Sequence, residues 1–246
     1  MKFFIGNWKM FGILSSNNII EKINKFKAKD RSNKYKIIIT PPYTLIESFS
    51  KKFKNSNIAI GAQNCFFKEK FSSNTGAISP FMVKKSGANY VIVGHSDNRA
   101  EGDNDEKLKL KLNFCLKLNL KVIFCIGENK KEKQKKITFK VLEKQLRNVL
   151  SKKFDPNKII VAYEPIWSIG TGLVPKNKDL SKTINFIKSS LRKLYNHKCP
   201  PVLYGGSVDE KNINQLKNLK EIDGFLIGGA SKSSKKFIDI IKNYYR

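Results

Sequence analysis

Short runs of apolar residues recur along the whole chain and form its main pattern. Each run is three to five residues long, continuous and rich in β-branched side chains. Such runs are typical of parallel strands that are buried on both faces. They occupy residues 3–5, 37–39, 58–60, 90–93, 122–126, 159–162, 201–204 and 225–227.

Between these runs, apolar residues recur at intervals of three and four, which predicts amphipathic helices. Asp179 and Ser181 are residue types that cap helices, so we expect them to cap the start of the helix that contains Ile184 and Leu191. Lys and Glu fill the outer faces. One apolar stripe consists of Leu142, Leu146, Val149 and Leu150, and another of Ile184, Ile187, Leu191 and Leu194.

Strands that alternate with helices imply βαβ units and a parallel sheet. Eight such units in 246 residues match an α/β fold of the (β/α)₈ barrel type, which usually has about 250 residues. The alternative is an open doubly wound sheet, but no G-x-G-x-x-G follows the first strand, which counts against a dinucleotide-binding version of it. The sequence shows no linker or low-complexity segment, so we predict a single barrel domain over residues 1–246.

Polar residues and glycines follow directly after the predicted strands. In a barrel the carboxyl ends of all strands meet on one face, which is where such folds carry their chemistry. We therefore expect these residues to converge there. They are Asn7 and Lys9, Gln63 and Asn64, His95, Glu164, Gly205 to Ser207, and Gly228 with Gly229.

Glu164 has the most informative position of these residues. The β-branched run 159–161 leads to this single carboxylate, and Pro165 then ends the strand because it has no N–H for the ladder. The following stretch, bounded by Pro165 and by Gly170 and Gly172, is a loop that can open and close. An exposed glutamate before a turn is the alternative interpretation.

The formal charge is +28, from 48 Lys and Arg against 20 Asp and Glu. Nucleic-acid or acidic-lipid binding is one explanation of such an excess. The lysines occur in almost every predicted helix and loop and not in one block. We therefore interpret them as solvated surface residues whose field helps to gather an anionic substrate.

The cysteines and the apolar content suggest a cytoplasmic protein. Cys65, Cys115, Cys125 and Cys199 are widely spaced, so we expect reduced and mostly buried thiols. The apolar stretch at residues 1–7 is too short for a signal peptide, and no run has the length of a membrane span.

Seven segments, in order and at sensible spacing, resemble the triosephosphate isomerase family from end to end of the chain. A single match would be weak evidence, whereas the ordered set is very specific. The segments are 6–10 (GNWKM), 61–64 (GAQN), 94–99 (GHSDNR), 125–128 (CIGE), 162–172 (AYEPIWSIGTG), 204–208 (YGGSV) and 223–231 (DGFLIGGAS).

The resemblance implies an acid–base mechanism. Glu164 would be the general base, and His95 the neutral electrophile, with a helix starting beside it that disfavours the imidazolium. Lys9 would supply positive charge to the enediolate and the phosphate, and Asn7 would hold Lys9 and contact the substrate. A core histidine is the alternative for His95, and His197 is interpreted as a surface residue.

The resemblance also implies a phosphate site and a closing lid, with no metal or organic cofactor, because acid–base groups alone can move a proton between adjacent carbons. Backbone N–H groups of Gly170, Ser207, Gly228 and Gly229 would bind the phosphate, although a tight turn is another reason for the last two glycines. Tyr204 and Ser207 would latch the lid. The lid consists of Pro165, Ile166, Trp167, Ser168, Ile169, Gly170, Thr171, Gly172, Leu173 and Val174.

Three positions depart from the family pattern. Asp97 stands where Glu is usual, which draws the carboxylate back by about 1.5 Å and affects the tuning of His95. Ala77 and Asn98 replace a Glu and an Arg that usually pair across the subunit interface. Thr75, which in the family reaches into the partner's site, is present, so a homodimer is still expected.

Three functions are therefore compared. The first is isomerisation of a triose phosphate, dihydroxyacetone phosphate to glyceraldehyde 3-phosphate. The second is another sugar-phosphate reaction on the same barrel, which would not combine Asn7, Lys9, His95 and Glu164. The third is nucleic-acid binding through the basic surface, but a pure binder has no use for an acid–base set. We predict the first, with no sequence-specific nucleic-acid binding and no membrane partner.

Overall fold

The computed structural model describes residues 1–30 and 32–246 and contains a closed barrel of eight parallel strands. The strands are β1 (Lys2–Asn7), β2 (Tyr35–Thr40), β3 (Ile58–Ala62), β4 (Tyr90–Val93), β5 (Lys121–Ile126), β6 (Ile159–Tyr163), β7 (Val202–Tyr204) and β8 (Gly224–Ile227). Each strand pairs with the next, and β8 closes the barrel against β1 with Gly224 opposite Phe3. The predicted (β/α)₈ barrel is confirmed, and the open sheet is excluded.

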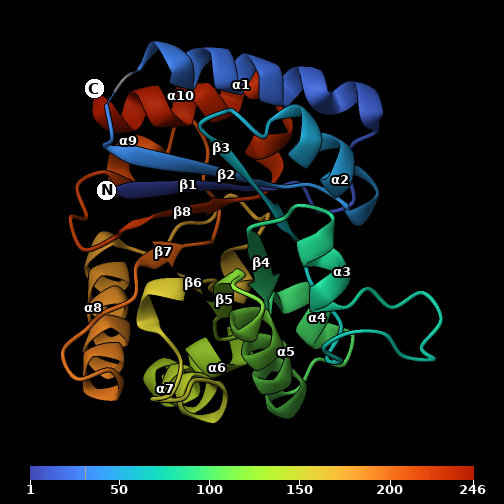
Figure 1. The fold of residues 1–246 in the computed structure, drawn as a ribbon. Helices are drawn as coiled ribbons and strands as arrows, with labels where there is room; N and C mark the ends of the chain where they lie inside the picture. Colours follow the sequence, from blue (N-terminus) through green and yellow to red (C-terminus); the bar gives the residue numbers. More distant parts are fainter. Residues whose placement is uncertain (31) are drawn as a thin grey trace.

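Helices surround the barrel (Figure 1). They are α1 (Asn17–Lys29), α2 (Tyr43–Lys52), α3 (Pro80–Lys85), α4 (Ser96–Ala100), α5 (Asp105–Lys117), α6 (Lys130–Gln134), α7 (Thr138–Val149), α8 (Asn177–Leu194), α9 (Ile213–Leu216) and α10 (Ser234–Tyr245). Short 3₁₀ helices lie at Leu14–Ser16, Pro156–Lys158, Ile166–Ser168 and Gly229–Lys232.

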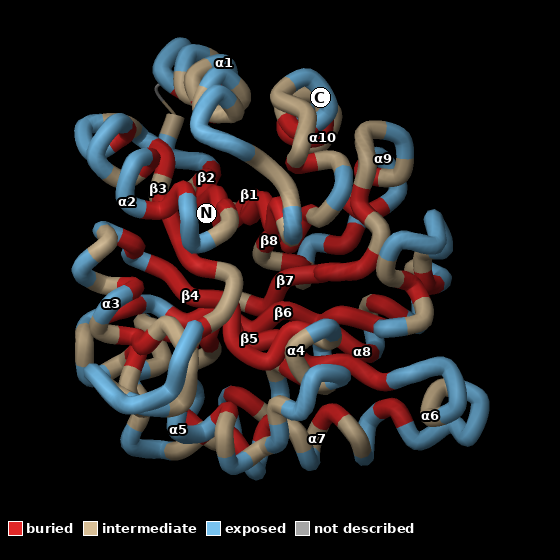
Figure 2. Tube along the Cα trace, turned by 90° about the vertical axis from the view of Figure 1, so that its right-hand side faces the viewer, coloured by how far each residue is buried: buried red, intermediate tan, exposed pale blue. Residues whose placement is uncertain are grey.

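Successive side chains of a strand point to opposite faces, so each strand contributes side chains to two hydrophobic cores. One core fills the barrel, with residues such as Ile92, Ile123 and Leu203, and the other packs between the strands and the helices. The strands are buried, whereas the helices are exposed on their outer sides (Figure 2). Side chains at the carboxyl ends of the strands are therefore held by a rigid scaffold.

The predicted helix stripes are confirmed, but the predicted caps are wrong. Leu142 and Leu146 are buried on α7, and Ile184 and Ile187 are buried on α8. Helix α8 begins at Asn177 with Lys176 at its N-cap, without a side-chain cap. Asp179 thus lies in the first turn, where its charge favours the helix dipole without capping it, and Ser181 lies inside the helix.

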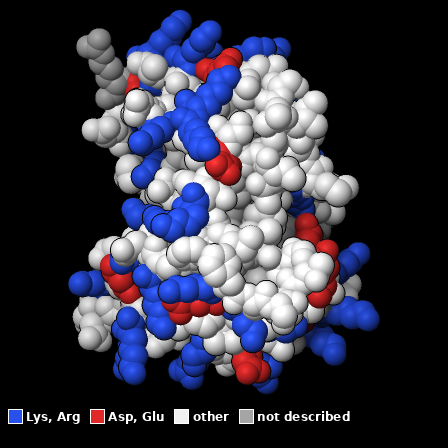
Figure 3. Space-filling model, turned by 45° about the vertical axis from the view of Figure 1, so that its right-hand side comes forward, with Lys and Arg blue, Asp and Glu red and all other residues white. Residues whose placement is uncertain are grey.

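Charged side chains are widely distributed. On the face shown in Figure 3, Lys and Arg occur from top to bottom of the view, with Asp and Glu among them. Helices in the described part of the chain are all too short or too polar to cross a membrane. Three cysteines are buried, Cys199 is half-buried, and none of the four forms a disulfide.

Candidate active site

Glu164 lies directly after β6 at the bottom of a pocket on the carboxyl face of the barrel. Its backbone N–H donates to the carbonyl of Ile126 at 2.8 Å, which extends the sheet by one more bond. The residue is only 3% exposed, so the alternative of an exposed glutamate is wrong. Burial raises the pKa of the Glu164 carboxyl above its usual range and outweighs the Cys125 hydrogen bond and the Lys9 charge, which oppose the shift. A carboxylate with a raised pKa is a better proton acceptor.

His95 faces Glu164 across the pocket and is the N-cap of α4. Its Nδ1 accepts the backbone N–H of Asp97 at 3.1 Å, so this nitrogen carries no proton. The proton of the neutral ring is then on Nε2, which lies 3.4 Å from Oε1 of Glu164. The geometry therefore aims an N–H donor of a neutral imidazole into the pocket beside the carboxylate.

Lys9 is held in an unusual backbone conformation. Its φ of 54° is left-handed, a conformation that lysine rarely adopts. The side chain of Asn7 accepts the Lys9 N–H at 3.0 Å, and the Gln63 amide donates to the Lys9 carbonyl at 2.8 Å. These two contacts stabilise the strained residue and fix the point from which its side chain leaves. Strain of this kind costs about 1–3 kcal/mol and is typical of functional sites.

Asp97 connects Lys9 with His95. Its Oδ2 is 3.0 Å from the Lys9 ammonium and 3.5 Å from Nδ1 of His95. The carboxylate pairs with the lysine, while Nδ1 of His95 is held by the Asp97 N–H at the shorter distance of 3.1 Å. The shorter side chain at position 97 therefore still reaches Lys9.

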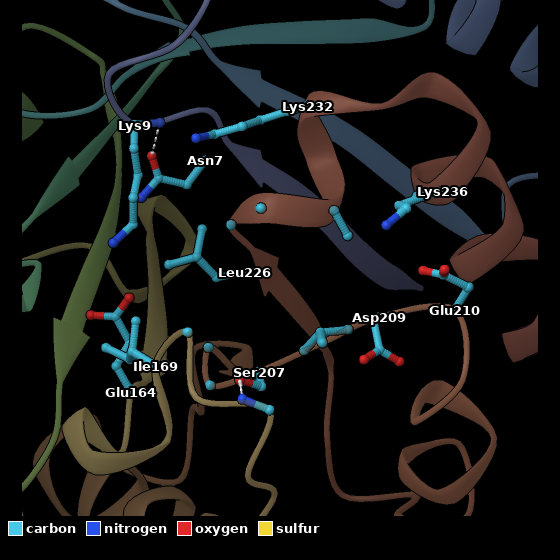
Figure 4. Close-up of a pocket in the computed structure, with 18 of the residues that line it drawn as sticks. Asn7, Lys9, Glu164, Ile169, Ser207, Asp209, Glu210, Leu226, Lys232 and Lys236 are labelled. Carbon is cyan, nitrogen blue, oxygen red and sulfur yellow. Dashed lines mark hydrogen bonds between the residues drawn. The ribbon is translucent and has the colours of Figure 1, made fainter.

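A cavity of about 560 Å³ extends from these groups to the loops after β7 and β8. Asn7, Lys9, His95 and Glu164 line one part of it, and Gly170, Ser207, Gly228 and Gly229 line the other. Figure 4 shows Lys9 and Glu164 to the left of Leu226, Asn7 above it and Ser207 below it. Gly229 opens the 3₁₀ helix Gly229–Lys232, whose first N–H groups have no acceptor within the helix.

The segment from Pro165 to Val174 lies beside the cavity and is tied to the loop after β7. The hydroxyl of Ser207 donates to the carbonyl of Ser168 at 2.7 Å and accepts the N–H of Gly172 at 3.1 Å. The hydroxyls of Ser168 and Tyr204 are 3.1 Å apart. Burial raises the pKa of Tyr204 to about 12, so its hydroxyl keeps its proton.

Glu128 is a residue to which the sequence argument assigned no role. Its fully buried carboxylate accepts the indole N–H of Trp167 at 2.9 Å and the Tyr163 hydroxyl at 3.1 Å. Burial raises the pKa of Glu128. This carboxylate anchors the start of the segment Pro165–Val174, through Trp167, to β5 and β6. Its place two residues after the end of β5, on the same face of the barrel as Glu164, was the signal that could have identified it. Gln63, which holds Lys9, was noted at a strand end but also received no role.

The expected interface residues lie outside this cavity. Thr75 is exposed on the long connection between β3 and α3, which extends away from the barrel in Figure 1. Ala77 and Asn98 line a second hollow of about 330 Å³. In residues 1–30 and 32–246, no group of three or more His, Cys, Asp or Glu side chains is placed to hold a metal ion.

Comparisons with known proteins agree over almost the whole chain. Residues 2–244 match the protein-family model described as "Triosephosphate isomerase". The triosephosphate isomerase of Thermodesulfovibrio yellowstonii is 37% identical over 245 residues, which is 98% of each chain. That of Wolbachia pipientis is 40% identical over 239 residues, covering 97% of this chain and 92% of the relative. The crystal structure of triosephosphate isomerase from Bartonella henselae superposes with a TM-score of 0.91 at 30% identity, covering 100% of this chain and 99% of the other.

Proposed function

The chain belongs to the triosephosphate isomerase family, and we propose that Glu164, His95 and Lys9 interconvert dihydroxyacetone phosphate and D-glyceraldehyde 3-phosphate on it. The single observation that carries this assignment is the 3.4 Å approach of the Glu164 carboxylate to Nε2 of His95 in one buried pocket. At this separation the carboxylate can remove a proton from a carbon atom while the imidazole N–H donates to the oxygen of the adjacent carbonyl group. The family match over residues 2–244 separates this function from other sugar-phosphate reactions on the same fold.

The reaction transfers a proton between adjacent carbons. Glu164 takes the proton from the carbon next to the carbonyl, while Nε2–H of His95 donates to the carbonyl oxygen. The resulting enediol(ate) is neutralised by the ammonium of Lys9. His95 then recovers a proton from the neighbouring hydroxyl, and Glu164 returns its proton to the neighbouring carbon. Protons balance within the three groups, so the proposal needs no metal and no organic cofactor.

Burial of Glu164 serves this chemistry. A carboxylate shielded from water has a raised pKa and therefore a greater tendency to take a proton. The segment Pro165–Val174 acts as the lid that completes this shielding, with Ser207 and Tyr204 as its latch. Glu128 holds the first turn of the lid through Trp167.

The substrate phosphate lies at the other end of the cavity. Backbone N–H groups of Gly170, Ser207, Gly228 and Gly229 donate to it, and glycine permits close approach of the backbone. The start of a 3₁₀ helix at Gly229 adds unpaired donors. Asn7 and Lys9 lie between the acid–base end of the cavity and its phosphate end.

The proposal extends to assembly and location. Met10 and Phe71 are 98% and 77% exposed on the loops after β1 and β3, and a second copy of the chain would cover them. Thr75, on the same loop as Phe71, would reach into the partner's site. A homodimer in the cytoplasm is therefore part of the proposal.

His95→Gln tests the assignment, and the second histidine of the chain supplies the control. His197 is exposed and does not line the cavity. We expect His95→Gln to lower kcat by at least 100-fold, the lower end of the usual acid–base contribution, while the protein stays folded. His197→Gln should retain wild-type kcat. An unfolded His95→Gln protein, or equal activity in the two variants, would contradict the assignment.

A further inference from the structure

Two lysines project into the outer part of the cavity, and the isomerisation as proposed uses neither. Lys232 is the last residue of the 3₁₀ helix Gly229–Lys232, and Lys236 lies in the first turn of α10. Both line the same cavity as Glu164. Figure 4 shows the Lys232 side chain extending toward Asn7 and Lys9, and Lys236 on the side of the cavity where Glu210 lies.

The electrostatic setting of Lys236 is unfavourable without an anion. Cations near a helix N-terminus are opposed by the dipole by about 0.3–1 kcal/mol. The first turn of α10 contains no acidic residue, but it contains Lys235 and Lys236. Neither Lys232 nor Lys236 makes an ion pair with a carboxylate in the part of the chain that the structure describes. The Lys232 ammonium lies 5.4 Å from the centroid of the Phe11 ring, a cation–π contact that does not neutralise its charge, so the charge of both lysines is available to a ligand.

Two carboxylates also line the outer cavity, and they do not neutralise these lysines by contact. Asp209 is occupied, since its Oδ1 accepts the N–H groups of Lys211 and Asn212, each at 2.8 Å. Glu210 lines the cavity, and its Oε2 is buried without a hydrogen-bond partner. The charge of Glu210 therefore lowers the positive potential of the outer cavity, but the carboxylate does not pair with either lysine.

The outer cations adjoin the inner phosphate site. Lys232 follows Gly229 by three residues, which is about one helical turn, and Lys236 follows in the next element. The cavity of about 560 Å³ continues past the glycines to these side chains. A phosphoryl group on the Gly228–Gly229 backbone would have a second anion site beside it.

We propose that Lys232 and Lys236 form an outer anion subsite, which takes the second phosphoryl group of a ligand with two linked phosphoryl groups. The first phosphoryl group occupies the inner site, so the inference rests on the proposed function. Such compounds are competitive inhibitors of the isomerisation and bind more tightly than a single phosphate.

The test compares inhibition constants for inorganic pyrophosphate and orthophosphate at fixed ionic strength and without divalent metal. In the wild type, pyrophosphate should bind at least about 10-fold more tightly. An exposed ion pair at the upper end of its usual range strengthens binding about 5-fold. Lys232→Gln and Lys236→Gln should therefore each lower the ratio of the orthophosphate to the pyrophosphate inhibition constant about 5-fold. In the double variant the preference for pyrophosphate should be absent.

Lys235→Gln is the matched control, because it removes the same charge from the same helical turn but does not line the cavity. Its ratio of inhibition constants should equal that of the wild type. Glu210→Gln should raise the ratio, since it removes the opposing charge. An equal loss of the ratio in Lys235→Gln and Lys236→Gln would overturn the subsite in favour of a general field.

Failure of the subsite and failure of the inner site have different signatures. If orthophosphate competes with the substrate but pyrophosphate binds no better, the outer subsite is wrong and the inner site stands. If orthophosphate does not compete with the substrate, the proposed inner phosphate site is wrong, and the outer subsite, which depends on it, is wrong as well.

Discussion

Gly229→Ala separates a glycine that serves the ligand from a glycine that serves a turn. The φ of Gly229 is not positive, and a Cβ added there would have no atom within 4 Å. The residue opens a 3₁₀ helix, so alanine fits its backbone. Nothing in the protein itself therefore requires glycine at this position, and the reason must lie in what approaches it.

The expected effects on stability and on binding have opposite signs. Gly→Ala at a compatible position stabilises by about 0.4–1 kcal/mol, because it restricts the unfolded chain. For a chain of this size the Tm should rise by about 1–4 °C. A methyl group on the phosphate side should disrupt a hydrogen bond to a charged group, worth about 1.5–3 kcal/mol, which weakens phosphate binding about 10- to 150-fold.

The assay pairs thermal unfolding with the competitive inhibition constant of orthophosphate. Gly102→Ala is the contrasting variant, since Gly102 has a φ of 103° in open space and does not line the catalytic cavity. It should lower the Tm and leave phosphate binding intact. A fall in Tm for Gly229→Ala with unchanged phosphate binding would show that the glycine serves the turn and would refute the argument.

Changes to the lid, to the buried carboxylate and to the interface positions have expected outcomes of their own. Deletion of residues 169–171 should divert the enediolate toward phosphate elimination, and an amount of inorganic phosphate per turnover no higher than wild type would count against the lid. Burial raises the pKa of Glu164 above 4.5, so its contribution to stability is present below about pH 4.5 and is lost as the pH rises through the raised pKa. Glu164→Gln should therefore be more stable than wild type at pH 7, by about 1.4 kcal/mol of unfolding free energy per unit of pKa elevation, and equal free energies of unfolding at that pH would contradict this cost. Asn98→Arg alone should weaken dimerisation by burying an unpaired charge, and Ala77→Glu in the same chain should restore much of it; additive effects in sedimentation equilibrium would mean that the two positions do not meet.

The fold was predictable because its signals are local. Each strand is a short β-branched run, and eight of them alternate with helical stripes. The predicted strand 201–204 was one residue too long, since β7 begins at Val202 after a proline that lacks an N–H. The caps of α8 were wrong because Asp179 is equally favourable in the first turn of a helix, and residue type alone does not separate the two positions.

The site was predictable as a set of positions but not as a set of contacts. Strand-end placement predicted that Glu164, His95 and Lys9 lie together, and they line one cavity because a barrel brings these strand ends together. The left-handed backbone of Lys9 depends on Gln63, which comes from a distant strand. The anchoring of Trp167 by Glu128 likewise joins two segments that no local pattern relates.

The central claim is that Glu164 is the base, and the kcat of Glu164→Asp tests it most directly. The shorter side chain retains the charge but withdraws it by about 1.5 Å, one carbon–carbon bond. A displacement of about 1 Å can cost about 100-fold in rate. We therefore predict a fall in kcat of at least 100-fold with little change in KM, measured in a coupled assay of triose phosphate isomerisation. A variant with wild-type kcat would remove Glu164 from this role.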